Sequence, residues 1–300
     1  MSIPAINIQR LHKNFGGVQA LQDVSLAVGQ GEFFALLGSN GAGKTTLISI
    51  LAGLTRADSG KAEIMGHDVV ENYQMARQLL GVVPQELAYD PFFTVRETLR
   101  MQSGYFGLRR NDDWIDEILH NLGLQGKAEM NMRTLSGGMK RRVLVAQALV
   151  HKPPVIILDE PTAGVDVELR LSLWNFVRQL NKQGHTIMLT THYLEEAEAL
   201  CNRVAMLKQG RLVALDSTAN LLRNASELIL QITIKSGVLT GELAARAVRQ
   251  AENDYTIAMK SPMDLEPILA QLRMGGVKLE NISLSQPDLE DVFVQIMGRA

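Results

Sequence analysis

The sequence predicts an α/β fold, because unbroken apolar runs alternate along the chain with stretches of helical periodicity. The clearest apolar runs lie within residues 155–158, 185–191 and 203–207. Such a run indicates a strand that is covered on both faces, as in a parallel sheet. Because ligands of these sheets bind at the carboxyl ends of the strands, the polar residues that follow each run are candidate site residues.

The 300-residue chain is long enough for one large or two ordinary domains. Apolar residues alternate with period two over residues 6–28, with a break at Gly16-Gly17, which predicts antiparallel strands in a small β-layer. Residues 94–133 have helical periodicity instead and predict an inserted helical region. After about residue 225 the pattern predicts a small α+β domain. Its predicted strands are 228–234, 255–259 and 277–284, and its predicted helices are 242–251, 265–274 and 289–297.

A glycine-rich loop between a predicted strand at 32–37 and a predicted helix at 47–54 fits the phosphate-binding P-loop, G-x-x-x-x-G-K-[ST]. Glycine allows backbone N–H groups to point at a phosphate, and the helix adds the positive end of its dipole. Lys44 is suited to neutralise β- and γ-phosphates, and Thr45 to offer its hydroxyl to Mg²⁺. A loop that merely joined a strand to a helix would not need Lys-Thr at its end. The loop comprises Gly38, Ser39, Asn40, Gly41, Ala42, Gly43, Lys44, Thr45 and Thr46.

Polar side chains follow three of the predicted strands. Asp159 is suited to hold Mg²⁺ through its water shell, and Glu160 to polarise a water for attack on phosphorus. Gln85 follows a strand that Pro84 ends, and His192 follows residues 185–191 and would lie within reach of a γ-phosphate. The simpler alternatives are a pair of solvent-facing acids and a histidine that is only a polar boundary residue.

Ser136, Gly137 and Gly138 precede a predicted helix over 140–149 that begins with basic residues. Ser136 is a favourable N-cap, and the two glycines leave the backbone bare for a close contact. Since basic charge at a helix N-terminus opposes the dipole, we expect an anion nearby. A capped surface helix with solvated Lys and Arg side chains is the alternative.

Charge and cysteine content bear on partners and compartment. A net charge of −2 and a pI near 6.3 give no reason to expect nucleic-acid binding. Cys201 is the only cysteine, which rules out an internal disulfide and favours a reducing compartment. The first five residues lack the features of a secretory signal, and no apolar run approaches the roughly 18 residues that span a bilayer. We therefore expect that a partner brings the chain to any membrane at which it works.

Together, these residues resemble the nucleotide-binding subunit of ATP-binding cassette (ABC) transporters, over about residues 6–225. The stretch Leu135-Ser136-Gly137-Gly138-Met139 matches the ABC signature, which separates this family from other P-loop proteins. The resemblance implies a P-loop NTPase core of the ABC type over residues 1–225, with an antiparallel β-subdomain and a helical subdomain at about 86–150. Residues 226–300 would form a C-terminal accessory α+β domain.

The resemblance also implies a role for each motif, with ATP and Mg²⁺ as cofactors. Phe15 takes the place of the aromatic residue that stacks on adenine, although spacing alone leaves a core position for Phe15 equally open. Gln85 matches the Q-loop glutamine, which bridges Mg²⁺ and the permease interface, and residues 163–166 match the D-loop. The sequence departs from the family's pattern at two positions. Phe15 replaces the common Tyr but keeps the ring face for stacking, and Met139 replaces the usual Gln but leaves the Ser-Gly-Gly donors in place.

On the same resemblance, Asp159 and Glu160 match the Walker B pair and His192 the switch histidine. Thr45, Gln85 and Asp159 are then expected at the metal. Glu160, His192, Lys44 and Gln85 are expected in catalysis. The P-loop residues, with Phe15, Val18, Ser136, Gly137 and Gly138, are expected at the nucleotide.

The family resemblance further implies two partners. One is a second copy in head-to-tail contact, so that Ser136 and its glycines close on the ATP held by the other copy. The other is a multi-span membrane permease, which would hold the chain peripherally at the cytoplasmic face of the cytoplasmic membrane. Residues 89–93, Tyr-Asp-Pro-Phe-Phe, would either receive a permease helix or pack internally.

Residues 190–198 and the Pro-Asp-Leu-Glu-Asp-Val-Phe pattern at 287–293 resemble bacterial export-type subunits that are encoded apart from their permease. Substrates in that family include drugs, lipids and polysaccharides. An importer-type subunit is one alternative. A soluble ABC ATPase acting on ribosomes or nucleic acid is another, but the sequence has neither a second cassette nor a long coiled-coil insert.

Overall fold

The structure is a computed structural model, and it describes residues 3–86, 88–162, 164, 167–224, 228–239, 241–249, 251, 253–259, 261–285 and 288–298. The chain forms two compact units, Met1–Ser217 and Thr218–Ala300. The division lies eight residues before the expected one, because the helix at 218–224 packs against the last helix of the chain. Each unit is described by itself below.

A mixed sheet forms the centre of the first unit, in the order β10-β9-β3-β8-β7-β6. Every neighbouring pair from β9 to β6 is parallel, and only β10 runs antiparallel to its neighbour. The predicted α/β fold with a parallel sheet is therefore confirmed. β3, β7 and β8 are buried along their whole length, which explains their unbroken apolar sequences. The strands are β3 (Phe33–Gly38), β6 (Leu80–Val83), β7 (Val155–Asp159), β8 (Thr186–Thr190), β9 (Arg203–Lys208) and β10 (Arg211–Ser217).

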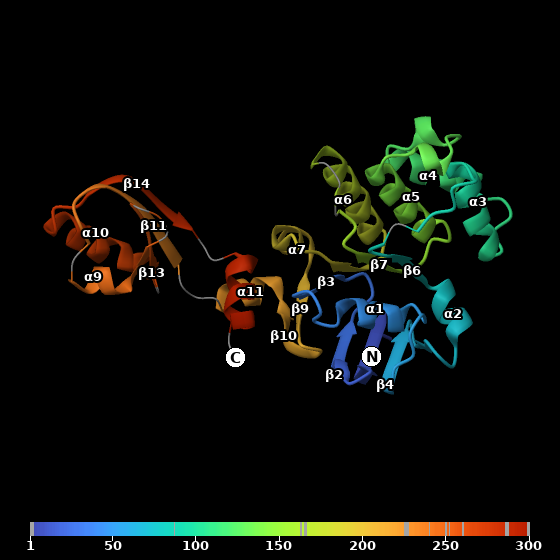
Figure 1. Ribbon diagram of the computed structural model, residues 1–300, viewed down its shortest axis with the longest axis horizontal. Helices are drawn as coiled ribbons and strands as arrows, with labels where there is room; N and C mark the ends of the chain where they lie inside the picture. The colour runs from blue at the N-terminus through green and yellow to red at the C-terminus, as the bar shows by residue number, and fades with distance from the viewer. Residues whose placement is uncertain are drawn as a thin grey trace. The chain divides into compact units, whose positions relative to one another are not determined.

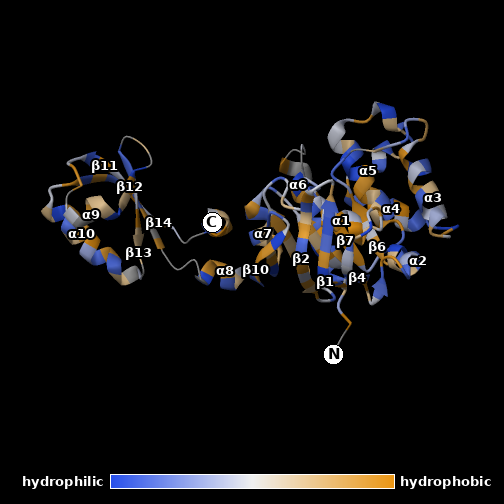
Figure 2. Ribbon diagram, turned by 60° about the horizontal axis from the view of Figure 1, so that its bottom comes forward, coloured by the Kyte–Doolittle hydropathy of each residue, from blue (hydrophilic) through white to orange (hydrophobic). Residues whose placement is uncertain are grey.

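The predicted antiparallel β-layer is present in the order β2-β1-β4-β5. Hydrophobic and hydrophilic residues alternate along its longer strands (Figure 2), so one face is apolar. That face shares one core with the central sheet and with α1 (Lys44–Leu51), the helix that follows the glycine-rich loop. The core thus fixes the start of α1 between two sheets. The strands are β1 (Ile6–Phe15), β2 (Val18–Val28), β4 (Ser59–Ile64) and β5 (His67–Asp68).

The predicted helical region is also present, and its helices α3, α4 and α5 pack together (Figure 1). Thr94 begins α3 with a capping box, since its hydroxyl accepts from the Glu97 N–H and the Glu97 carboxylate accepts from the Thr94 N–H. Sequence reasoning did not foresee the short α2 or the strand β10. The remaining helices of the unit are α2 (Tyr73–Gln78), α3 (Val95–Tyr105), α4 (Asp112–Asn121), α5 (Gly137–Leu149), α6 (Val167–Lys182), α7 (Leu194–Leu200) and the 3₁₀ turns η1 (Gln125–Lys127) and η2 (Met132–Thr134).

The second unit contains a four-stranded antiparallel sheet in the order β12-β13-β11-β14. Its β-α-β-β-α-β chain order gives the ferredoxin-like topology. The predicted helix over 242–251 is wrong in its second half, because residues 247–249 pair with β13 instead. Tertiary pairing here overrides local helical preference. The elements are α8 (Thr218–Asn224), β11 (Leu228–Ser236), α9 (Gly241–Arg246), β12 (Ala247–Arg249), β13 (Asp254–Met259), η3 (Pro262–Asp264), α10 (Leu265–Met274), β14 (Lys278–Ser285) and α11 (Leu289–Gly298).

Within the described ranges, none of the helices combines the length and the apolar character that crossing a membrane requires.

His151 links the end of α5 to the central sheet. Its ring stacks on Phe106 with centroids 3.7 Å apart and planes 4° from parallel, and Nε2 lies 3.2 Å from the Leu80 carbonyl oxygen. Nδ1 is buried without a hydrogen-bond partner among the described residues, so a second ring proton has no acceptor there. Burial lowers the pKa of His151 to about 4.

We expect His151 to make the folded state sensitive to acid. Because its pKa is lower in the folded than in the unfolded chain, the unfolded state binds more protons between about pH 4 and 6.5. The free energy of unfolding should therefore fall as the pH falls through this window, by roughly 2 kcal/mol after allowance for partial exposure of the ring. Chemical denaturation at several pH values should give a shallower slope for His151→Gln. The exposed control His120→Gln should keep the wild-type slope, and parallel curves for all three proteins would contradict the expectation.

Candidate functional site

Four parallel strands bring the glycine-rich loop, Gln85, Asp159, Glu160 and His192 to one edge of the central sheet. The other predicted site residues lie elsewhere, with Phe15 and Val18 in the β-layer and Ser136, Gly137 and Gly138 at the start of α5. In the order β3-β8-β7-β6 the strands are direct neighbours, and parallel pairing places all four carboxyl ends at the same edge. The glycine-rich loop follows β3, His192 follows β8, Asp159 and Glu160 end β7, and Gln85 follows β6. Residues as far apart in sequence as Gly38 and His192 thus lie at one edge.

The glycine-rich loop needs glycine at two of its positions for steric reasons. Gly38 and Gly43 have φ of +156° and +107°, which L side chains rarely adopt. A Cβ on Gly38 would lie 2.5 Å from the Leu207 carbonyl oxygen, and a Cβ on Gly43 would lie 2.5 Å from that of Ala20. Neighbouring backbone therefore holds the loop in its curled shape.

Lys44 lies in the first turn of α1, and its side chain is folded back under the loop. Only 7% of the residue is exposed, and Nζ donates to the carbonyl oxygens of Gly38 at 2.7 Å and Ser39 at 3.2 Å. Burial lowers the pKa of Lys44, although the charges of Glu160 and Asp159 act to raise it. That electrostatic coupling shows that the end of β7 lies close to the loop.

The residues around Lys44 fit a phosphate group with its Mg²⁺. Ser39, Asn40, Gly41 and Thr45 are exposed, whereas Ala42 and Gly43 are buried and Thr46 is half-buried. The exposed part of the loop thus offers the hydroxyl of Thr45, the residue after Lys44. The described residues contain no cluster of three or more His, Cys, Asp or Glu side chains that would hold a metal ion. A hydroxyl and one carboxylate, completed by phosphate oxygens and water, are the donor set that suits Mg²⁺.

Asp159 is buried at the end of β7, with 3% of the residue exposed. The Thr190 hydroxyl donates a hydrogen bond to Oδ1 of Asp159. Burial raises the pKa of Asp159, and the Thr190 hydrogen bond partly offsets this effect. A cation bound next to this carboxylate would therefore relieve a desolvation cost that the protein alone leaves in place.

Glu160 is the meeting point of two other predicted residues. His192 Nε2 lies 2.6 Å from Glu160 Oε1, and Gln85 Nε2 donates to Glu160 Oε2 at 3.0 Å. Glu160 has a left-handed backbone with φ of +50°, which is uncommon for a residue other than glycine. Asp159 and Glu160 are buried and so do not face solvent, and His192 is paired with Glu160.

Ser136 caps α5, since its hydroxyl accepts from the Met139 N–H at 3.3 Å. Ser136 and Gly137 are exposed, and a Cβ built on Gly137 or Gly138 would meet no atom within 4 Å. Packing within the chain therefore does not require glycine at these two positions, which leaves room for a group that approaches from outside.

The basic residues that follow Ser136 are not simply solvated. Arg141 and Arg142 are 3% and 6% exposed and donate to backbone carbonyls, while Lys140 Nζ lies 4.2 Å from the Tyr89 ring centroid. Burial lowers the pKa of Arg141, although the charges of Asp159 and Glu160 act to raise it.

Phe15 is 49% exposed at the end of β1, so its core alternative is wrong. Val18, at the start of β2, is 69% exposed and pairs with Phe15 in the antiparallel ladder. Lys13 Nζ lies 5.0 Å above the Phe15 ring. The two residues thus form a small exposed apolar surface with a cation beside it. Of the D-loop residues, Ala163, Val165 and Asp166 lie outside the described part of the chain.

Sequence reasoning missed Glu196, which anchors both segments that carry the catalytic candidates. Its buried carboxylate accepts from the hydroxyls of Thr191 at 2.7 Å and Thr162 at 3.1 Å and from Trp174 Nε1 at 3.1 Å. Thr162 follows Glu160 by two residues and Thr191 precedes His192. The available signal was helical spacing, which puts Glu196 on the same face as Leu200, four residues later.

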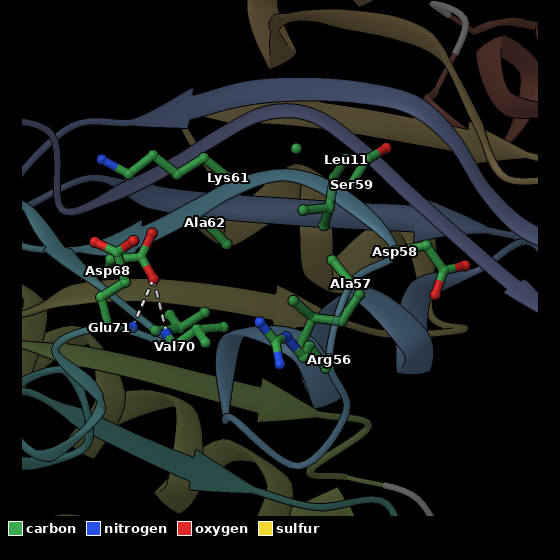
Figure 3. A pocket seen from close by; sticks show the side chains of 13 residues that line it. Leu11, Arg56, Ala57, Asp58, Ser59, Lys61, Ala62, Asp68, Val70 and Glu71 are labelled. Atoms are coloured by element: carbon green, nitrogen blue, oxygen red, sulfur yellow. Dashed lines mark hydrogen bonds between the residues drawn. The ribbon is translucent and has the colours of Figure 1, made fainter.

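A separate cavity of about 270 Å³ lies between β4 and the turn after α1 (Figure 3). Arg56 and Lys61 line it together with Asp58, Asp68 and Glu71, so cations and carboxylates are mixed. The Asp68 carboxylate accepts from the N–H groups of Val70 and Glu71. None of the predicted site residues lines this cavity.

Known proteins resemble the chain over its full length. A model of the ABC transporter family matches residues 21–163. The Nod factor export ATP-binding protein I of Burkholderia thailandensis is 38% identical, and the match covers 100% of this chain and 99% of that protein. The linearmycin resistance ATP-binding protein LnrL of Bacillus subtilis is 34% identical, with 98% of each chain covered.

Solved structures match the first unit's fold. The structure of an ATP-binding subunit of an ABC transporter has a TM-score of 0.70 and 27% sequence identity, and the match covers 73% of this chain and 92% of that one. A dimeric ATP-binding cassette bound to ADP and phosphate, at 24% identity, has a TM-score of 0.65 and 71% and 98% coverage. With relatives of this identity along its entire length, the chain belongs to the ABC transporter family as an ATP-binding subunit.

Proposed function

We propose that the chain hydrolyses ATP at the edge formed by β3, β8, β7 and β6, and that hydrolysis drives export through a separate membrane permease. The single observation that carries the catalytic part is the hydrogen-bonded group of Glu160, His192 and Gln85 beside Asp159 and the Lys44 loop. A buried, mutually supported carboxylate next to a phosphate-binding loop is suited to general-base chemistry on water.

We assign the individual roles from these positions. The loop N–H groups and Lys44 hold the phosphates, and Lys44 exchanges its present carbonyl partners for phosphate oxygens. Thr45, Asp159 and Gln85 hold Mg²⁺, which supplies charge neutralisation on the phosphate oxygens. Glu160 takes the proton of the attacking water, while His192 and Gln85 fix the carboxylate from its two oxygens. Phe15 and Val18 contact the base of the nucleotide.

The site is completed by a second copy of the chain. Ser136 and Gly137 are exposed and Gly138 is half-buried, and a Cβ on either glycine would meet no atom within 4 Å, so packing within the chain does not account for the two glycines. Bare backbone and a hydroxyl at the start of a 13-residue helix are suited to a phosphate that arrives on another molecule. Two copies in head-to-tail contact would place each signature loop on the nucleotide of the other.

The names of the full-length relatives support export, since one concerns Nod factor export and another linearmycin resistance. By analogy, this chain works at the cytoplasmic face of the cytoplasmic membrane, held there by its permease. Copurification distinguishes this proposal from an importer function. An exporter subunit should copurify with a permease alone, and an importer subunit with a permease and a substrate-binding protein.

Replacing the base tests the catalytic assignment. Glu160→Gln keeps the size of the side chain and one acceptor oxygen but removes the carboxylate. We expect ATP binding to persist, a stable dimer to form, and turnover to fall by about 10²- to 10⁴-fold. Turnover of radiolabelled ATP and light scattering of the purified full chain measure these outcomes. Glu195→Gln makes the same chemical change at an exposed position of α7 and should leave turnover unchanged. Full turnover by Glu160→Gln would remove Glu160 from its role.

The segment at 89–93 is suited to receive the permease. Phe92 is 83% exposed and Phe93 is half-buried, so the pair does not simply pack inside the chain. Tyr89 accepts a hydrogen bond from Lys140 Nζ at 3.0 Å, which ties this segment to the start of α5 four residues from Ser136. A permease helix bound here would thus act on the signature loop as well as on Gln85.

Loss of the Phe92 ring should weaken docking without changing the isolated subunit. Removing an aromatic anchor from an interface costs about 2 kcal/mol, or roughly a 30-fold weaker association. Phe92→Ala should therefore need more permease in proteoliposomes to reach the wild-type ATPase rate, while its basal turnover and thermal midpoint stay the same. The control Met274→Ala changes an equally exposed apolar residue of the second unit. Equal permease dependence in wild type and Phe92→Ala would exclude this docking site.

A further inference from the structure

Arg141 is a buried cation whose hydrogen bonds join two neighbouring strand ends of the site. Its Nη1 donates to the carbonyl oxygens of Pro84 and Gln85, each at 2.7 Å. Its Nη2 donates to those of Asp159 at 3.3 Å and Glu160 at 2.5 Å. One guanidinium group therefore contacts four carbonyl oxygens. Two belong to consecutive residues after β6, and two belong to consecutive residues at the end of β7.

These contacts begin where the β6–β7 ladder stops. The last registered pair between the two strands is Val83 with Leu158. Beyond that pair the carbonyls of residues 84, 85, 159 and 160 no longer face a neighbouring backbone in this ladder. The planar fork of arginine fits such a pair of strand ends, since Nη1 donates to the carbonyls after β6 and Nη2 to those at the end of β7. Arg141 thus continues the connection between β6 and β7 after backbone pairing has ended.

The same contacts hold Glu160 in its left-handed backbone conformation. A non-glycine residue at φ of +50° costs on the order of 1 kcal/mol and persists only where its surroundings fix it. The Glu160 N–H donates to the Thr190 carbonyl at 3.1 Å, and the Glu160 carbonyl accepts from Arg141. The residue is therefore fixed on both sides of its Cα, which aims the carboxylate at Gln85 and His192.

We infer that Arg141 is a positioning residue for ATP hydrolysis, which sets the relative placement of Gln85 and Glu160 through their backbone carbonyls and joins both to the signature helix α5. This inference rests on the proposed role of Glu160. Arg141 lies one turn after Gly137, so a displacement of the signature loop along α5 is transmitted directly to both strand ends. Arg141 is 3% exposed, and its hydrogen bonds among the described residues go to the ends of β6 and β7 rather than to the loop around Lys44.

The inference predicts a loss of turnover that is separate from ATP binding. Arg141→Met keeps the length of the side chain and leaves the four carbonyls without their donor, and we expect kcat to fall about 10²-fold, as for a displacement of about 1 Å in a reacting group. Arg141→Lys keeps the charge but lacks the fork, and should lose about tenfold in kcat. The dissociation constant for ATP, measured by calorimetry on the full chain, should stay within about threefold of wild type, since the phosphates bind elsewhere.

Two controls separate positioning from general stability. Arg142→Met removes a neighbouring guanidinium of similar burial, whose carbonyl acceptors are Leu122 and Gly123 in the helical region. It should lower the thermal midpoint but leave kcat of the folded fraction within about threefold. The second control is Arg141→Met in a Glu160→Gln background, where residual single-turnover rates should fall by less than about twofold, because residues that act through one another are not additive.

Each outcome has one meaning. Three results would overturn the inference while leaving the role of Glu160 intact. They are an unchanged kcat in Arg141→Met, an equal loss of kcat in Arg142→Met, and an equal fold-loss from Arg141→Met in the wild-type and Glu160→Gln backgrounds. Full turnover by Glu160→Gln alone would instead overturn the proposed function on which the inference rests.

Discussion

Parallel pairing of β3, β8, β7 and β6 is the constraint on which the site depends. Each of these strands is followed by a functional segment, and parallel pairing requires that all four segments emerge at the same edge. Neither the P-loop lysine nor the two carboxylates could meet the histidine and the glutamine without this arrangement. The buried, apolar sequences of β3, β7 and β8 are therefore as necessary to the site as the polar residues at their ends.

Within that edge, burial of charge makes the site responsive to its ligands. Lys44 and Asp159 are both buried. Burial lowers the pKa of Lys44 and raises that of Asp159, so it favours the neutral form of each side chain. Lys44 satisfies its ammonium with two loop carbonyls, and Asp159 relies on the Thr190 hydroxyl. A phosphate and a divalent cation would supply the opposite charges that these two groups lack.

Two buried side chains hold the segments at this edge in place. Glu196 joins the segments after Glu160 and before His192 through three side-chain donors. Arg141 joins the ends of β6 and β7 through four carbonyls. Both residues connect segments that the backbone ladders of the sheet no longer hold. They also extend from the site toward α5 and α6, so the geometry of the catalytic group depends on helices at some distance along the chain.

The sequence by itself determined the fold class, the glycine-rich loop and the order of the motifs, because each depends on local rules of periodicity, steric freedom and strand burial. Those rules also placed most elements of the second unit within a few residues. Only the tertiary structure decided that residues 247–249 form a strand, since their partner is β13 rather than a neighbour in sequence. It also decided that Phe15 is exposed and that Arg141 and Glu196 are buried. The sequence does not reveal whether a charged side chain is surrounded by water or by four carbonyl groups. The difference depends on how segments that are distant in sequence pack around it.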